Sequence, residues 1–204
     1  MIMANGTPGN KAIPQQSKLL RAMQKHPAIT LHSPLTIVGG GTDLYVQRHD
    51  EMTNAAIHFA FDYPELNGIN KEGNRCIMGS GVTVSDLIAS PVINDAIPDF
   101  HRYAKLVSST PIRNMATIAG NFINASPIGD FTIFFLALDA QLIMSDGTIT
   151  RELPLPKLYK GYKILDKKKE ELIKQIWFEL PCKNTFFHFE KVSKRTHLDI
   201  ASVN

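Results

Sequence analysis

Residues 116–130 read ATIAGNFINASPIGD, a stretch without Lys, Arg or Glu whose only charge is Asp130 at its end. Two Gly and two Asn lie within it, and an apolar run, FTIFFLALDA, follows at 131–140. Gly, Asn, Ser and Pro at this density are unfavourable inside a helix or a strand. We therefore predict that 116–130 is a loop whose backbone contacts a ligand. A buried helix is predicted over Phe131–Ala140.

A second glycine-rich stretch, VGGGTDL, occupies residues 38–44 after a short apolar run. The pattern predicts a strand, a glycine turn, and a helix that begins at Thr42 or Asp43. Three consecutive Gly let a backbone approach a ligand closely and point N–H groups at an anion. The stretch is not a Rossmann-type motif, because Leu44 stands where a third Gly is required, and no P-loop lysine follows. A tight turn without a ligand explains it equally well.

Polar residues in the first stretch suggest two uses. TIAGN at 117–121 offers Thr, Gly and Asn groups that could bond to a phosphate or to the edge of a flavin. Asp130 could accept hydrogen bonds from sugar hydroxyls, as carboxylates do in nucleotide sites. Asp130 could instead cap the helix that follows it. The two roles can coexist.

Composition excludes several classes of protein. The 204 residues are 44% hydrophobic and 20% charged, which is typical of a globular protein with a packed core. A net charge of +3 does not favour nucleic acid or an anionic membrane as a partner. The longest apolar run is too short to span a bilayer, and the N-terminus lacks a secretory signal, so we expect a cytoplasmic location. Cys76 and Cys182 cannot by themselves form a disulfide framework, a zinc site or an iron–sulfur cluster. No HExxH or GxSxG motif occurs, and no catalytic or metal-binding residue is predicted.

Further elements follow from local patterns. Thr83 and Asp86 have the spacing of a capping box, which predicts a helix to about Ala89. Asp146-Gly147 predicts a hairpin turn within 141–153. KKKEE at 167–171 is most simply a solvated run of charges. The remaining expected elements are a helix near 100–107 and strands near 54–60, 75–81, 172–180 and 185–192. Helices and strands mix without strict alternation, which favours an α+β fold.

Three stretches, at 38–44, 108–130 and 158–181, together resemble the FAD-binding domain of molybdenum hydroxylases of the xanthine dehydrogenase and carbon monoxide dehydrogenase type. SPIGD and the Gly161-Tyr162-Lys163 stretch are most similar to the bacterial xanthine dehydrogenase small subunit. The resemblance implies an α+β fold with two subdomains, of the vanillyl-alcohol-oxidase (PCMH) type. It also implies a polar segment over 1–14, an FAD-binding domain over 15–181 with its subdomain boundary near 70–80, and the start of a truncated C-terminal domain over 182–204.

The resemblance also assigns residues to FAD. The first glycine loop would hold the pyrophosphate with Ile37, Val38, Gly39, Gly40, Gly41, Thr42, Asp43 and Leu44. The second segment would contribute Thr117, Gly120, Asn121 and Asp130. Ile123 matches an apolar side chain that packs on the isoalloxazine ring, Lys191 a lysine near the flavin, and Ile173 a further contact.

The function that the resemblance implies is electron transfer in an oxidoreductase. Electrons would leave a substrate at a molybdenum centre, pass through iron–sulfur clusters to FAD, and reach NAD or another acceptor. The molybdopterin and the iron–sulfur cluster would lie on a large subunit and on an iron–sulfur subunit, or on missing segments. Two alternatives are open: a flavin-free binding or assembly module derived from the same domain, and a nucleic-acid-binding domain using KVSKR at 191–195. The last lacks aromatic residues interleaved with the basic ones.

Overall fold

The computed structural model describes residues 36–53, 55–182, 184–196 and 198–203, all within one unit, Leu31–Asn204. The predicted polar segment 1–14 and the first part of the predicted FAD-binding domain lie outside the described residues. Helices and strands are mixed along the chain, as the α+β prediction requires. Within the described ranges no helix is both long enough and apolar enough to cross a membrane.

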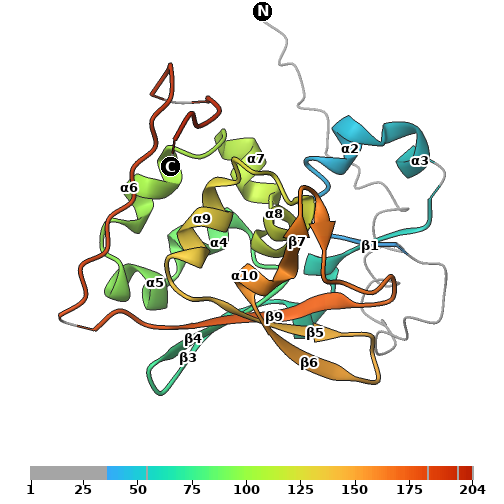
Figure 1. Ribbon diagram of the computed structural model, residues 1–204, viewed down its shortest axis with the longest axis horizontal. Coiled ribbons are helices and arrows are strands. Elements are labelled where there is room, and N and C mark those ends of the chain that lie inside the picture. Colours follow the sequence, from blue (N-terminus) through green and yellow to red (C-terminus); the bar gives the residue numbers. More distant parts are fainter. Residues whose placement is uncertain (1–35, 54, 183, 197, 204) are drawn as a thin grey trace, which may run out of the picture. The chain divides into compact units, whose positions relative to one another are not determined.

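A five-stranded antiparallel sheet forms the floor of the core (Figure 1). Its strands, in spatial order, are β3 (Ile69–Glu72), β4 (Arg75–Gly79), β9 (Leu172–Glu179), β5 (Gln141–Ser145) and β6 (Thr150–Pro154). Side chains alternate between the two faces of a strand, so apolar residues at alternate positions form one buried face on each of the three central strands. The buried side chains of the three central strands include Cys76, Met78, Leu142, Met144, Ile173, Ile176 and Phe178.

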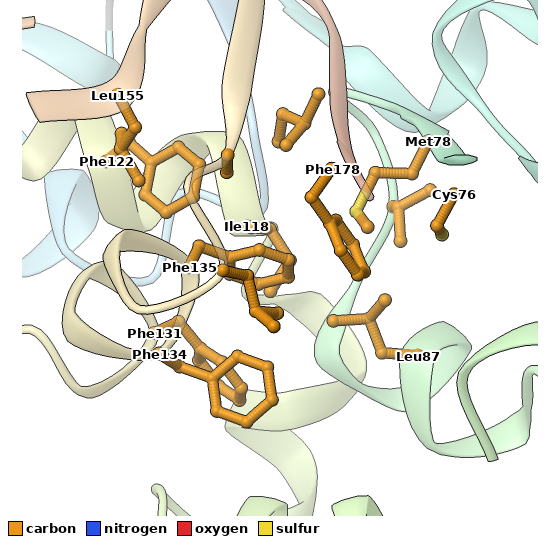
Figure 2. Packing of buried hydrophobic residues seen from close by; sticks show 14 of the residues in the cluster. Cys76, Met78, Leu87, Ile118, Phe122, Phe131, Phe134, Phe135, Leu155 and Phe178 are labelled. Carbon is orange, nitrogen blue, oxygen red and sulfur yellow. The ribbon is translucent and has the colours of Figure 1, made fainter. Parts of the chain in front are cut away.

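Short helices gather on one side of this sheet (Figure 1). They are α4 (Val84–Ala89), α5 (Pro91–Ala96), α6 (Phe100–Lys105), α7 (Thr110–Met115), α8 (Ile118–Asn124), α9 (Asp130–Leu136) and α10 (Leu155–Leu158). Aromatic side chains fill the space between helices and sheet, as Figure 2 shows for Phe122, Phe135 and Phe178. The rings of Phe135 and Phe178 meet edge to face with centroids 5.7 Å apart, a favoured geometry for buried aromatic pairs.

The N-terminal part of the described chain carries the first glycine loop. Strand β1 (Thr36–Val38) pairs in parallel with β2 (Ile57–Phe59), and α2 (Leu44–Gln47) and α3 (His49–Thr53) connect them. Two 3₁₀ helices, η1 (Ala60–Asp62) and η2 (Pro64–Leu66), lead on to β3. The predicted strand, glycine turn and helix are confirmed, with Asp43 at the N-cap position of α2.

Two local predictions hold in detail. The Thr83 hydroxyl accepts a bond from the Asp86 amide at 3.1 Å, and the Asp86 carboxylate accepts one from the Thr83 amide at 2.8 Å, which completes the capping box. The hairpin of β5 and β6 is also confirmed. Its connection runs over 146–149 rather than two residues, and Gly147 takes the positive φ, 94°.

The prediction of a loop over 116–130 is wrong, because α8 occupies Ile118–Asn124. Thr117 caps this helix, and Ile118 and Phe122 are fully buried on its inner side. Burial of an apolar face therefore outweighs the low helix propensity of Gly and Asn. The next helix, α9, is confirmed as buried but ends at Leu136, before the predicted Ala140.

The strand predicted at 185–192 is also wrong. The described part of this segment contains an isolated bridge from Val192 to Val203 and no strand. Phe187 and Phe189 nevertheless point the same way, and both pack edge to face against Phe134 of α9. The apolar alternation thus reflects packing on helices. A short hairpin, β7 (Tyr159–Gly161) with β8 (Ile164–Leu165), precedes β9.

The prediction that the charge run at 167–171 is solvated is wrong at one position, because the side chain of Glu171 is buried. Glu171 has only 6% of its side chain exposed and accepts two bonds from the Arg151 guanidinium, at 2.7 and 2.9 Å. The ion pair fixes the end of this run against β6.

Candidate flavin site

A cleft of about 570 Å³ lies where the two glycine-containing segments and the C-terminal residues meet. Its volume falls within the roughly 300–1,000 Å³ that ligand sites occupy. Polar and apolar groups contribute to its walls. The lining residues are Asp43, Val107, Ser108, Ser109, Ile112, Asn121, Asn124, Ser126, Ile128, Gly129, Asp130, Lys191, Arg195, Leu198, Asp199, Ile200 and Ala201.

The first glycine loop packs directly against the segment that precedes α8. A Cβ at Gly39 would lie 2.3 Å from the Thr117 hydroxyl oxygen, and a Cβ at Gly40 would lie 1.6 Å from the Met115 carbonyl oxygen. A side chain at Gly40 therefore requires the Met115 backbone to move, and one at Gly39 requires the Thr117 side chain to move. Gly41 has a φ of 69°, a conformation that favours glycine. The glycines thus bring the two segments together.

The same loop holds backbone donors without a protein acceptor. Among the described residues, the amides of Gly40, Gly41 and Thr42 donate no hydrogen bond to the protein, although Gly40 and Gly41 are buried. Buried N–H groups normally have partners, so these suit an anionic group such as a pyrophosphate. Asp43, the next residue, lines the cleft. The loop therefore fits the phosphate-binding role expected of it.

Helices α8 and α9 are held to each other by residues predicted to bind FAD. Thr117 accepts a bond from the Gly120 amide at 3.1 Å, and a Cβ at Gly120 would lie 2.8 Å from that hydroxyl oxygen. Asn121 Oδ1 accepts bonds from the Thr132 amide at 3.0 Å and from the Thr132 hydroxyl at 3.1 Å. The N-cap of α9 is Gly129, which has no side chain, so Asn121 supplies the acceptor that this helix end needs.

The two charged residues predicted near the flavin form an ion pair. Lys191 Nζ lies 2.9 Å from Asp130 Oδ2 and also donates to the Leu106 carbonyl at 3.1 Å. Only 3% of the lysine side chain and 11% of the aspartate side chain are exposed, and both line the cleft. Asp130 is the first residue of α9 and Gly129 the N-cap, so the structure does not support Asp130 as the N-cap. A carboxylate in the first turn still stabilises the helix by interacting with the positive end of its dipole.

The other predicted contacts lie further from the cleft. Ile123 is partly buried on α8 against the core, and Ile173 is buried within β9 with 3% of its surface exposed. Neither lines the cleft. Ile37 and Val38 belong to β1, and Leu44 begins α2. Their roles in FAD binding stay predictions.

Several lining residues were not predicted from the sequence. Ser108, Ser109 and Ser126 are polar, and Ile112, Ile128 and Ile200 are apolar. Ser108 and Ser109 lie between α6 and α7, directly before Thr110-Pro111. Two small polar residues at such a helix–helix connection could have indicated them. Arg195 was considered only for nucleic acid, yet it lines this cleft.

A family model and several curated proteins are similar in sequence to this chain. The family model for the FAD binding domain in molybdopterin dehydrogenase matches residues 14–181. The carbon monoxide dehydrogenase medium chain of Hydrogenophaga pseudoflava is 26% identical over 133 residues, 65% of this chain and 46% of the relative. The nicotinate dehydrogenase FAD-subunit of Eubacterium barkeri is 26% identical over 174 residues, 83% of this chain and 59% of the relative. The chain thus spans about half the length of these curated relatives.

Solved structures show the same fold. Carbon monoxide dehydrogenase from Hydrogenophaga pseudoflava superposes with a TM-score of 0.74 at 23% identity, covering 94% of this chain and 64% of the other. Quinoline 2-oxidoreductase from Pseudomonas putida 86 gives a TM-score of 0.75 at 18% identity, covering 90% and 62%. Since the family model matches most of the sequence, the chain belongs to the FAD-binding domain family of the molybdopterin dehydrogenases, and its cofactor is FAD.

Proposed function

We propose that this chain is the flavin-carrying electron-transfer unit of a molybdenum hydroxylase, and that FAD occupies the cleft between its two glycine-containing segments. When bound, the flavin would take up electrons singly and deliver them as a pair to NAD or another acceptor. The observation that carries the proposal is the junction of the two segments. There, the amides of the buried residues Gly40 and Gly41 have no acceptor among the described residues, and Asp43 of the same loop lines a cleft of about 570 Å³.

The first glycine loop would bind the pyrophosphate. The amides of Gly40, Gly41 and Thr42 have no acceptor among the described residues, so an anion can bond to them without displacing a protein partner. Gly39 and Gly40 pack against the segment before α8 and hold the loop in place. Binding would then require little rearrangement of the backbone.

The Lys191–Asp130 pair would orient the flavin end of the cofactor. The pair puts an ammonium group and a carboxylate on the wall of the cleft, with little of either exposed. Asp130 would accept hydrogen bonds from cofactor hydroxyls, and Lys191 would place positive charge beside the ring. Ile123 and Ile173, which do not line the cleft, stay predicted contacts of the ring.

We also propose two subdomains of the PCMH type with a boundary near 70–80. The β1–β2 pair lies within 36–59 and the five-stranded sheet begins at Ile69, so the change from one sheet to the other falls just before the proposed boundary.

The remaining parts of the electron path would lie on partners. Relatives include a chain that is named a medium chain and one that is named an FAD-subunit, which supports a large molybdopterin-binding subunit and an iron–sulfur subunit beside this chain. A xanthine dehydrogenase of Emericella nidulans, 24% identical over 188 residues, supports a xanthine dehydrogenase-like enzyme. A cytoplasmic location, expected from the sequence, stays part of the proposal.

Identification of the bound cofactor tests this function. The purified full chain is expected to absorb in the flavin bands and to release FAD on heating, which mass spectrometry identifies. Release of FMN alone would contradict the two-loop site. A colourless chain that binds no added FAD would favour the flavin-free assembly module instead.

A further inference from the structure

The turn between α6 and α7 forms one wall of the cleft and holds an unfavourable backbone conformation. Val107, Ser108 and Ser109 all line the cleft. Ser108 has a φ of 55°, in the left-handed region that disfavours residues other than glycine. Such a conformation persists only where surrounding contacts impose it.

Arg113 supplies those contacts. Its side chain folds back from α7 over the turn, and Nη1 donates to the carbonyl oxygens of Val107 at 3.0 Å and Ser108 at 2.7 Å. Nη2 donates to the Thr110 hydroxyl at 2.9 Å. One planar guanidinium thus binds three groups of a four-residue turn. Arg113 itself does not line the cleft that the described residues form.

The two carbonyls at the end of α6 are bound by two different cations. Lys191 binds the Leu106 carbonyl, and Arg113 binds the Val107 carbonyl, one residue further on. Carbonyls at a helix C-terminus have no partner within the helix and favour positive charge. Lys191 also reaches the cleft, whereas Arg113 lies behind its wall.

We propose that Arg113 is a positioning residue for the flavin, which fixes the Val107–Thr110 turn in the shape that the cofactor meets without touching the cofactor. The inference rests on the proposed function. Without the guanidinium, Ser108 would relax toward a negative φ and carry Ser109 with it. Lys cannot substitute, because a single ammonium on a flexible stem lacks the planar fork that reaches three acceptors.

The test compares three variants of the full chain by FAD titration, thermal unfolding and hydrogen exchange of the 107–110 amides. Arg113→Met removes the donors but keeps an apolar stem, and Arg113→Lys keeps the charge. Arg75→Met is the matched control, because Arg75 bonds to Glu179 and stacks on Trp177 on the sheet, among residues that do not line the cleft.

Arg113→Met and Arg113→Lys are each expected to raise the Kd for FAD by about tenfold or more, on the scale of one strained residue. Hydrogen exchange of the 107–110 amides is expected to accelerate in both Arg113 variants. Arg75→Met is expected to change neither the Kd for FAD nor this exchange rate. Unchanged FAD affinity in the Arg113 variants would overturn the proposal, as would weaker binding with unchanged exchange, which would mean direct contact with the cofactor. If Arg113→Met fails to fold, Arg113→Lys decides. A parent chain that binds no FAD would overturn the proposed function, and this inference with it.

Discussion

The two glycine-containing segments look alike in sequence but are built in different ways. In the first, Gly40 is needed because the Met115 backbone lies where a side chain would be, and Gly39 faces the Thr117 side chain in the same way. In the second, Gly120 lies inside a helix, and the neighbouring polar side chains cap helix ends. Small residues can therefore signal either a close approach of two backbones or a helix packed around its own caps. Four predictions test this comparison, in order of decreasing effect.

Gly40→Ala is expected to have the largest effect. The new Cβ would collide with the Met115 carbonyl, so the two segments must separate. Overpacking of this kind costs about 3 kcal/mol, and FAD binding should be lost because the loop amides move. Chemical denaturation and FAD titration measure the two effects.

Gly73→Ala is the control for this variant. Gly73 has a φ of 59° but no atom within 4 Å of an added Cβ, so only backbone strain remains, about 1 kcal/mol. FAD affinity should not change. If both variants lose the same stability and both bind FAD, the first segment is an ordinary turn.

Asp130→Asn is expected to have the next largest effect. Asn keeps an acceptor but leaves the buried Lys191 ammonium without its counterion, which costs about 3 kcal/mol. Denaturation of the apo chain measures this loss. Adding Lys191→Met should restore part of the stability, because it removes the uncompensated charge. A fully stable single variant would show that the pair has no structural role and would leave Asp130 to the cofactor alone.

An ion pair outside both segments supplies a pH-dependent comparison. The Arg151 guanidinium lowers the pKa of Glu171 from 4.5 to about 2. A lowered pKa stabilises the folded chain above the ordinary pKa, and this contribution disappears as the pH falls from about 4.5 toward 2. Glu171→Gln should therefore lower the free energy of unfolding by about 2 kcal/mol at pH 7, and the difference from the parent should shrink in acid. A difference that is constant with pH would contradict this explanation.

Asn121→Ala is expected to have the smallest effect, about 1 kcal/mol, because the Thr132 amide at the start of α9 loses its acceptor. Asn121→Asp retains an acceptor and should stay near the parent in thermal unfolding. If Asn121→Ala is as stable as the parent, the polar residues of the second segment serve only the ligand.

Local signals in the sequence predicted much of the fold. The capping box of Thr83 and Asp86 and the Asp146-Gly147 hairpin depend on neighbours in the chain, so pattern alone located them. The strand predicted at 185–192 failed because its alternating Phe residues pack on α6 and α9, an arrangement that depends on tertiary structure. Alternating apolar residues show that one side of a segment is buried, but not whether that side packs on helices or belongs to a sheet.

The candidate site could be predicted in part. Asp43, Asn121, Asp130 and Lys191 were predicted and do line the cleft. The ion pair between two of them, 61 positions apart, could not be anticipated from the sequence. The helix at 118–124 was missed because its Gly and Asn have structural uses that appear only when α8 meets α9.

Hydrogen exchange with and without FAD tests the central claim, that one cofactor bridges both segments. Saturating FAD is expected to slow exchange of the amides at 40–43 and of those at 126–130, where Ser126, Ile128 and Gly129 line the cleft. The β3–β4 hairpin, which contributes no residue to the cleft, should exchange at the same rate in both states. Protection confined to one segment, or absent from both while FAD is bound, would contradict the account.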